Sequence, residues 1–418
     1  MNPRSIGPMP RFRLYSSTGQ YVEVVKNLLL GRLHWGQDCA RLERTFEARY
    51  DVPNALCMPK ARVAIHKAIK AYVKPGKSVI LSPYTISDVI NMVIAAGAIP
   101  VFADLVGNTC NIGIETISPL VDENTGAVMV THLHGLACDM APIEALCRDR
   151  GLALIEDAAQ ALGAKDNNRP VGTIGDAGIF SFGMYKNINS FFGGLLICDD
   201  NNIAESIRRQ RDLFPWQETP YYLRKVIGGL ITDVATWPPI FRTITYRIFQ
   251  FGYLKNIALL NQQVTIDAAP EQKRHLADSY FRRMTPLQAR LVLKQLDALT
   301  KQIEKRIAHA ALYRGGLSDI DELGLPPYRT NHGHTYSYFP ILAPNRDDLL
   351  RYLMQRGRDI GAQHLKNCAD LACFKEFARD CPNARRTAAS VVLLPTYPSY
   401  GADEVEKTVA CIRAYFGV

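Results

Sequence analysis

The sequence predicts an α/β fold with a mostly parallel central sheet, followed by a small α+β domain at the C-terminal end. Short runs of aliphatic and β-branched residues alternate with helical patterns over the first half of the chain. Strands that alternate with helices run parallel and are joined by crossover helices. The chain has 418 residues, which is too long for one ordinary core, so we expect two domains or one large domain and a small one.

The predicted elements follow each other regularly in this first half. After a helical stretch over residues 20–50, the strand-like runs lie at 54–59, 78–83, 99–105, 126–135, 152–160, 177–182 and 193–199. The helical runs between them lie at 61–73, 88–98 and 140–151. Ligands of such sheets bind beyond the carboxyl ends of the strands, so the polar residues at those ends are the first candidates for a site.

The second half of the chain departs from this alternation. Residues 213–263 are rich in aromatic residues, isolated Arg and Lys, and prolines, and look like an insertion. One long helical pattern begins at about residue 284, and a strand at 335–343 with helices at 346–357 and 404–416 completes a small domain. The predicted organisation is an N-terminal arm and helix at 1–50, a large domain at 51–212, the insertion at 213–265, a linking long helix at 266–330 and the small domain at 331–418.

The composition narrows the class of partner. The net charge of +9 suits nucleic acid, a membrane surface or an anionic small substrate. The basic residues are scattered and no zinc-finger or RNP-like motif is present, so we expect no nucleic-acid partner and no metal site. The 10 cysteines form no C-x-x-C pair and the N-terminus lacks an apolar signal-peptide core, which indicates a cytoplasmic chain with free thiols. No uncharged run reaches the ~20 residues of a membrane span.

Four polar residues follow two of the predicted strands. Asp157 ends the run "LALIED" with Gln160 three residues on, and Ser181 and Lys186 follow the run "AGIF". Burial disfavours an ammonium, so a lysine in apolar surroundings becomes a neutral amine that can form a Schiff base with an aldehyde. Pyridoxal phosphate needs such a lysine, an acid for its ring nitrogen and donors for its phosphate. Two simpler interpretations stay open: Asp157 as a helix cap and Lys186 as a surface lysine.

Several segments together resemble the DegT/StrS-type sugar aminotransferases, which are fold-type-I pyridoxal-phosphate enzymes. The similar segments are "KPGKSVILSPYTISDVINMVIAAGAIPVFADL", "VMVTHLHGLACDMAPIEALCRDRGLALIEDAA", "VGTIGDAGIFSFGMYKNINSFFGGLLICDD", "TPLQARLVLKQLDAL", "GAQHL" and "LLPTYPSY". The resemblance covers about residues 30–418 apart from the insertion. It implies a three-layer sandwich of the aspartate-aminotransferase type, with 51–212 as the domain that binds pyridoxal 5'-phosphate.

The resemblance also implies roles for single residues. Lys186 would hold the cofactor and carry the proton between the two halves of transamination. Asp157 would pair with the ring nitrogen and keep it protonated. Gln160 would contact the phenolic oxygen of the ring, and Ser181 would donate to the phosphate. His132, in the family's "H..G" motif, would play a supporting part.

The reaction and the partners follow from the same resemblance. An amino acid, with glutamate as the expected donor, would give its amino group to a nucleotide-linked keto-sugar for cell-surface glycan or secondary-metabolite synthesis. Family members form homodimers with active sites at the interface. The family's dehydratases carry a histidine at the lysine position, so Lys186 argues against that activity. The candidate substrate residues are His132, Tyr84, Arg283 and His364.

The predicted phosphate site departs from the family pattern. The family has "SGTAAL" at the start of the first large helix, where a threonine hydroxyl and backbone amides bind the phosphate. This chain has "PKARVA" there, with Lys60, Ala61 and Arg62. Either Lys60 or Arg62 replaces the lost donor as a charge on the phosphate, or both lie on the exposed face of the helix and cofactor affinity is weaker.

Two more family positions are changed. The aromatic residue that stacks on the cofactor ring falls at Ile86, with Tyr84 two residues away as a substitute. Phe281 stands where the family has an asparagine that reaches the partner's phosphate, beside the matching Arg283.

The sequence "FFGG" replaces the family's "GEGG", which places Phe191 and Phe192 close to the lysine. One interpretation of all these changes is an active aminotransferase with a remodelled phosphate site and a more apolar substrate pocket. The other is a cofactor-impaired homologue that acts as a binding or scaffold subunit. We favour the first because Lys186 and Asp157 are both present.

The insertion carries a second hypothesis. After Trp237 and two prolines, apolar residues alternate with Arg242 and Arg247; the apolar residues are Ile240, Phe241, Ile244, Ile248, Phe249 and Phe251. Such a helix suits a membrane interface with anionic headgroups, so we predict peripheral membrane contact through 213–263 as one use of the segment. A packed lid or a dimer contact is the simpler alternative.

Overall fold

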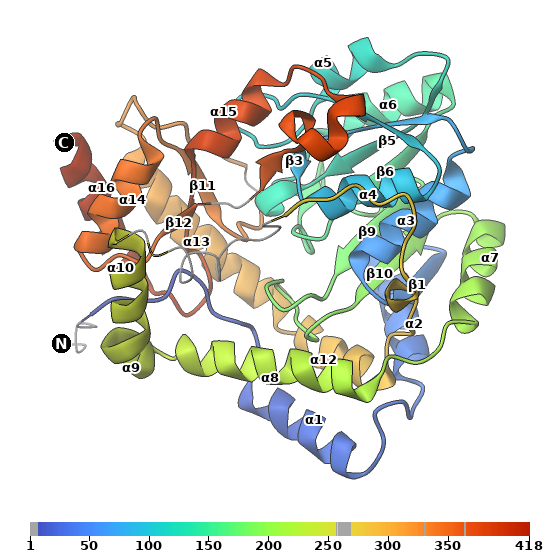
Figure 1. The fold of residues 1–418 in the computed structure, drawn as a ribbon, viewed down its shortest axis with the longest axis horizontal. Coiled ribbons are helices and arrows are strands. Elements are labelled where there is room, and N and C mark those ends of the chain that lie inside the picture. The colour runs from blue at the N-terminus through green and yellow to red at the C-terminus, as the bar shows by residue number, and fades with distance from the viewer. Residues whose placement is uncertain (1–6, 256, 258–268, 330–331, 363–364) are drawn as a thin grey trace.

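The computed structural model describes residues 7–255, 257, 269–329, 332–362 and 365–418. The chain folds into a large domain around a seven-stranded sheet, with a smaller C-terminal domain beside it (Figure 1). The predicted α/β fold class is confirmed.

The central sheet has the order β1-β10-β9-β6-β5-β2-β4. Its strands are β1 (Asn54–Met58), β2 (Ser78–Leu81), β4 (Ile99–Phe102), β5 (Thr125–Thr131), β6 (Ala153–Asp157), β9 (Ala177–Ser181) and β10 (Gly194–Cys198). Neighbouring strands from β9 to β4 pair in parallel, whereas β10 is antiparallel to both β9 and β1. The helices α3 (Ala61–Tyr72), α4 (Ser87–Ala95) and α6 (Met140–Arg150) lie between consecutive strands in the sequence, as parallel pairing requires.

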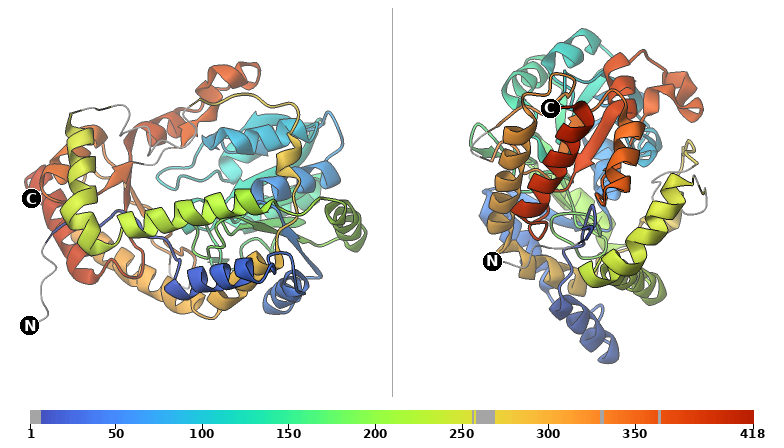
Figure 2. Two further views of the ribbon diagram at one scale, coloured as in Figure 1. Left: turned by 60° about the horizontal axis from the view of Figure 1, so that its bottom comes forward. Right: turned by 90° about the vertical axis from the view of Figure 1, so that its left-hand side faces the viewer.

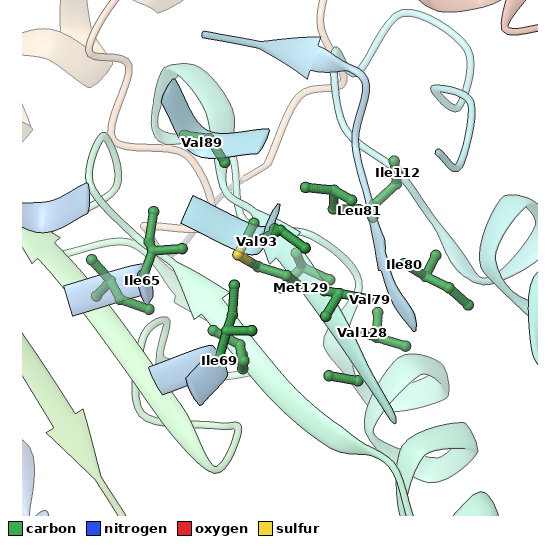
Figure 3. Packing of buried hydrophobic residues seen from close by; sticks show 14 of the residues in the cluster. Ile65, Ile69, Val79, Ile80, Leu81, Val89, Val93, Ile112, Val128 and Met129 are labelled. Atoms are coloured by element: carbon green, nitrogen blue, oxygen red, sulfur yellow. The ribbon is translucent and has the colours of Figure 1, made fainter. Parts of the chain in front are cut away.

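Each face of the sheet has its own apolar core, because alternate strand residues point to opposite sides. In β1, Leu56 and Met58 belong to the core that α3 and α4 cover. Ala55 and Cys57 belong to the other core, which includes side chains of α2 (Asp38–Tyr50), α12 (Pro286–Leu296) and α13 (Leu299–Leu317). Figure 3 shows part of the first core, where isoleucines of α3 and valines of α4 pack over β2 and β5. The chain therefore forms the predicted three-layer sandwich.

The small domain is built on a three-stranded antiparallel sheet of order β11-β14-β12. Its strands are β11 (Phe339–Leu342), β12 (Gly361–Ala362) and β14 (Val391–Leu394), and its helices are α14 (Arg346–Gln355), α15 (Pro382–Ser390) and α16 (Ala402–Phe416). The remaining named elements are α1 (Thr18–Leu29), α5 (Ile114–Ile117), α7 (Asn201–Asp212), β3 (Tyr84–Thr85), β7 (Lys165–Asp166), β8 (Arg169–Pro170) and β13 (Lys366–Asn367).

The long helix predicted from residue 284 is two helices, so that expectation is wrong. Thr285 starts α12 with a reciprocal cap: its hydroxyl accepts the Gln288 N–H at 3.3 Å, and the Gln288 side chain accepts the Thr285 N–H at 3.0 Å. The helix ends at Leu296, and α13 begins three residues later at Leu299. α12 packs on the large domain and α13 continues to the small domain, where it contacts α16.

The inserted segment forms α8 (Thr219–Ala235), α9 (Pro238–Ile240) and α10 (Tyr246–Leu254), with a π-helical turn at Phe241–Thr245 between the last two. α8 runs across the large domain, and α10 turns away from it to stand against the small domain (Figures 1 and 2). The second contact is specific, because the Tyr246 hydroxyl and the Gln250 side chain both donate to the carbonyl of Met354 in α14.

No helix within the described ranges is long and apolar enough to cross a membrane.

Candidate active site

The predicted site residues converge where β6, β9 and β10 meet the start of α3. Gly194 opens β10 and pairs with Ser181 on one side and Met58 on the other. A Cβ at Gly194 would lie 2.6 Å from the backbone nitrogen of Ala61, so this position requires glycine. The glycine lets the first residue of α3 approach the end of β9, which brings the Ser181 hydroxyl and the N-terminus of α3 to the same place.

Lys186 and Asp157 are charge neighbours at this end of the sheet. Asp157 is the last residue of β6 and is buried, and its Oδ1 accepts the Ala159 N–H at 3.0 Å. Burial raises the pKa of this carboxyl, and the Lys186 ammonium partly offsets the rise. Burial lowers the pKa of Lys186, against the opposing charge of Asp157 and with a further lowering from Arg62. The neutral amine form of Lys186 is therefore more accessible than that of an ordinary surface lysine.

Gln160 links this group to the loop that precedes β11. Its Oε1 accepts the His134 N–H at 3.2 Å, and its backbone carbonyl accepts the Ser337 hydroxyl at 2.7 Å. The Ser337 N–H donates to the His134 carbonyl at 2.9 Å and the Thr335 N–H to the Gly135 carbonyl at 2.8 Å, so the two loops bind each other through their backbones. The large and small domains are therefore joined beside the lysine.

His134 is the residue of this group that sequence reasoning missed. Its ring is fully buried, and neither Nδ1 nor Nε2 has a hydrogen-bond partner among the described residues. Burial, with a contribution from the Lys186 charge, lowers the pKa of His134 to about 3, so the imidazole is neutral. A buried imidazole without partners is costly, which indicates that a polar ligand completes this site. The signal was available, since His134 lies in the same "THLHG" stretch as His132.

His132 contacts the end of β6, where its backbone N–H donates to the carbonyl of Asp157. Its Nδ1 accepts the Cys138 N–H at 3.0 Å, so the ring proton is on Nε2, which lies 3.0 Å from Glu156 Oε2. Glu156 also accepts the backbone N–H groups of Gly172, Ile174 and Gly175 at 2.6–2.8 Å. Burial alone would raise the pKa of Glu156, but the hydrogen bonds from His132 and from these backbone groups lower it. The pair fixes the end of β6.

Lys60 and Arg62 lie at the N-terminus of α3, where a phosphate would bind. The Lys60 ammonium sits 5.3 Å from the ring centre of Tyr221 and 5.4 Å from that of Tyr280, a cation–π arrangement. Arg62 forms an ion pair with Asp88 in α4, and its charge also acts on Lys186. Burial lowers the pKa of Lys60 to about 8, with further lowering from Arg62. Neither residue is a fully exposed surface cation.

α8 adds further cations to this cluster. The charge of Lys225 also lowers the pKa of Lys60, and the guanidinium of Arg224 lies 5.3 Å from the ring centre of Tyr221. We name Lys60, Arg62, Arg224 and Lys225 the cationic cup. Its basic groups repel one another, and a bound anion would relieve this repulsion. The helix N-terminus beside them also favours negative charge, so the cup is suited to bind an anion. Tyr221 and the α8 cations were not predicted, because "TPYYLRK" belongs to a segment interpreted as an insertion.

The contacts described for the other predicted residues do not include Lys186. Ile86 precedes α4, half-buried against the large core. Tyr84 is buried in that core, where its neighbours include Cys110 and Arg346, so its substrate role gains no support. Arg283 stacks on Trp216 at 4.2 Å. His364 falls outside the described residues.

Phe191 and Phe192 correct one expectation. Their rings pack with Tyr221, Tyr222 and Val226 of α8 and belong to a cluster with these residues. Phe191 has a left-handed backbone with φ of 70°, which is unusual for a phenylalanine. The two rings anchor the added helix to the loop that carries Lys186.

The donor set of the site fits pyridoxal 5'-phosphate. The cofactor's aldehyde requires an amine with a lowered pKa, and its ring nitrogen requires a carboxylate; Lys186 and the buried Asp157 supply these. The phosphate requires donors and positive charge, which the serine hydroxyl at the helix N-terminus and the cationic cup supply. The unpartnered nitrogens of His134 add a polar group that this structure leaves unsatisfied.

Comparisons with known proteins show similarity over most of the chain. A model of the DegT/DnrJ/EryC1/StrS aminotransferase family matches residues 18–228 and 253–413. GDP-perosamine synthase of Vibrio cholerae is 26% identical over 392 residues, with 91% of each chain covered. Spore coat polysaccharide biosynthesis protein SpsC of Bacillus subtilis is 28% identical over 402 residues, which cover 94% of this chain and 92% of the relative. An aminotransferase structure from Psychrobacter cryohalolentis shares the fold, with a TM-score of 0.77 and 23% identity over 98% of this chain and 99% of that chain.

Proposed function

Because the chain belongs to the DegT/DnrJ/EryC1/StrS aminotransferase family, we propose that it moves an amino group from an amino acid, with glutamate as the expected donor, to a nucleotide-linked keto-sugar. The observation that carries the proposal is the meeting of Lys186, Asp157 and the cationic cup at one end of the sheet. Relatives support the substrate class: one is named a GDP-perosamine synthase, and one structural neighbour, DesI, is described with its TDP-sugar product.

Pyridoxal 5'-phosphate is the proposed cofactor, and each part of it has a candidate holder. Lys186 would bind its aldehyde carbon, Asp157 its ring nitrogen, Gln160 its phenolic oxygen and Ser181, with the backbone amide of Ala61, its phosphate. When bound, the cofactor supplies an electron sink for the substrate carbon and carries the amino group from donor to acceptor.

Lys186 has the central chemical part. With its pKa lowered by burial, Nζ is available as a neutral amine that can take a proton from the substrate carbon and return one to it. Asp157 lies close enough to the lysine for the two charges to act on each other, and its carboxylate would keep a ring nitrogen protonated. The His132–Glu156 pair keeps the end of β6, and so Asp157, in place.

The cationic cup supports an anionic substrate as well as the cofactor phosphate. Lys60 and Arg62 lie at the start of α3, while Arg224 and Lys225 come from α8, so the cup extends beyond the group of donors that one phosphate occupies. We assign the outer cations to the diphosphate of a sugar nucleotide. We also propose that the chain works as a homodimer in the cytoplasm, as its family resemblance implies.

A cofactor-impaired scaffold subunit is the competing hypothesis, and the site does not favour it. Such a subunit would have no need of a half-buried lysine with a lowered pKa beside a buried carboxylate, whereas this chain has both. The lost threonine hydroxyl is also compensated by charge at the same helix end.

The test begins with the purified protein and pyridoxal phosphate. We expect a visible absorption band that glutamate bleaches, and a Lys186→Ala variant that folds but shows no band. Absence of a band with the parent protein at saturating cofactor would refute the proposal and support the scaffold hypothesis. A panel of nucleotide-linked keto-sugars, scored by return of the band after glutamate treatment, would then identify the acceptor.

A further inference from the structure

The outer side of α8 is apolar where a surface helix is normally polar. Ile227, Leu230, Ile231 and Val234 are 45–63% exposed. With 3.6 residues per turn they fall within an arc of about 100° on the helix. The opposite side of α8 is also apolar, and its residues, including Tyr222, pack on Phe191 and Phe192. An ordinary surface helix buries one apolar stripe and presents polar residues outward, so the exposed stripe needs a partner.

The apolar surface continues beyond α8 along the inserted segment. Trp237, between α8 and α9, is 53% exposed, and Ile244, Ile248 and Phe251 are 48–58% exposed. The last two belong to α10, whose inner side is held by Tyr246 on α14. The predicted stripe is therefore divided: Phe241 is buried and Phe249 packs against the same cluster, Ile240 is half-buried, and Ile244, Ile248 and Phe251 are exposed.

α1 extends the same surface on the other side of α8. The Tyr21 hydroxyl donates to Asp233 of α8 at 2.6 Å, and the two helices lie side by side in Figures 1 and 2. Val22, Val25 and Leu29 of α1 are 54–83% exposed and line an open depression of about 550 Å³. We call the exposed apolar residues of α1, α8, Trp237 and the π turn with α10 the apolar face.

Basic residues outnumber acidic residues around the apolar face. Residues 219–255 contain five basic residues (Arg224, Lys225, Arg242, Arg247 and Lys255) and one acidic residue, Asp233. Asp233 points inward to the Tyr21 hydroxyl, so it does not offset these cations at the surface. Lys26 and Arg32 of the α1 region are exposed as well. The border of the face is thus strongly basic.

Most of this surface is an addition to the family fold. Residues 229–252 lie outside the ranges that the family model matches, and they contain Leu230, Ile231, Val234, Trp237 and the exposed residues of 244–251. An interface shared by the family would be expected to use the shared fold. Most of this face therefore lies outside the part of the chain that the family model matches.

We propose that the apolar face docks the protein on the surface of a membrane rich in anionic phospholipid. Apolar side chains flanked by Lys and Arg are the pattern of helices that lie in the interface plane, and an exposed tryptophan suits the headgroup level. A second copy of the chain fits less well, because a two-fold contact through this face would bring the basic borders of both copies together. The proposal does not depend on the identity of the substrate.

The test is co-sedimentation of the full chain with vesicles. We expect binding to vesicles that contain phosphatidylglycerol, loss of binding as salt rises, and at least about tenfold weaker binding to phosphatidylcholine alone. An Ile231→Ser and Ile248→Ser double variant should bind at least about tenfold more weakly. Leu312→Ser, which changes an exposed leucine of α13 outside the face, is the matched control and should bind like the parent.

A second variant tests the charge separately. Arg247 and Lys255 are exposed and outside the cationic cup, and Arg247→Gln with Lys255→Gln should weaken binding to anionic vesicles by roughly fivefold per residue. The cofactor absorption band and the circular dichroism spectrum check that each variant is folded. Failure of the parent to sediment with anionic vesicles overturns the proposal. So does parent-like binding by both double variants, or conversion of a dimer to monomers by Ile231→Ser and Ile248→Ser without a change in vesicle binding.

Discussion

Lys60 gives the sharpest prediction for the cationic cup. The Lys60→Met variant keeps an apolar stem between Tyr221 and Tyr280 and removes only the ammonium. A hydrogen bond to a charged group contributes about 1.5–3 kcal/mol. If Lys60 holds the cofactor phosphate, the variant should bind pyridoxal phosphate roughly 10- to 150-fold more weakly at pH 7.

The pKa of Lys60 makes the effect depend on pH. Its pKa is about 8 in the ligand-free protein, so the ammonium is present at pH 7 and mostly lost at pH 9. A bound phosphate favours the charged form, so the pKa rises on binding and the contribution of Lys60 declines as the pH rises above about 8. The affinity ratio of parent to variant should fall by about tenfold between pH 7 and pH 9. Taking the ratio cancels the titration of Lys186, which both proteins share.

The assay is equilibrium titration of cofactor-free protein, followed by the visible absorption of bound cofactor at both pH values. Pyridoxal, which lacks the phosphate, is the matched ligand, and Lys60→Met should leave its affinity unchanged. Lys70→Met, an exposed lysine at the far end of α3, is the matched control variant. Equal losses for pyridoxal and pyridoxal phosphate, or a ratio that does not change with pH, would refute the assignment of Lys60 to the phosphate.

Three further changes test other parts of the structure. Asp157→Asn should retain cofactor but reduce amino transfer by roughly 10²–10³-fold, since a preorganised charge is lost; stopped-flow bleaching by glutamate measures it, and a parent-like rate would contradict the role. Phe191→Ala should lower the free energy of unfolding by about 3–5 kcal/mol in a denaturant titration. In Gly229→Ala the new Cβ would lie 2.9 Å from the Phe191 ring, so this change should lower the free energy of unfolding less when it is combined with Phe191→Leu. Glu156 has a lowered pKa, so its stabilisation is full above about pH 4.3 and is lost as the pH falls through its folded value. The Glu156→Gln variant should therefore be less stable than the parent at pH 7 and should lose less stability on acidification. An acid-unfolding curve identical to that of the parent would contradict this prediction.

The central sheet could be predicted because its strands are buried on both sides. Runs such as "SVIL" and "ALIED" have apolar residues with no helical period, and the helices between them are amphipathic, so local sequence and global fold agree. Asp157 and Ser181 could be placed together for the same reason: they end neighbouring parallel strands, and such ends share one edge of the sheet.

The inserted helices could not be placed from the sequence. Their apolar residues lie on more than one side of each helix, so periodicity alone did not show which side packs on the protein. The "FFGG" stretch was misinterpreted for a related reason. Phe191 was considered only against the nearby lysine, whereas its partners in α8 lie about 30 to 35 residues further along the chain. His134 was missed because it differs from His132 only in its contacts: both rings are fully buried, but the ring nitrogens of His134 alone have no hydrogen-bond partner among the described residues.

The added helix connects three features that the sequence left separate. α8 carries Lys225 of the cationic cup near its start and Val234 of the apolar face near its end, about 14 Å apart along the helix axis. Its buried side rests on Phe191, which belongs to the same loop as Lys186. A rigid helix with these contacts cannot shift at the apolar face without moving the cup or the loop. The "FFGG" rings therefore hold in place a helix that carries both a cation of the cup and part of the apolar face.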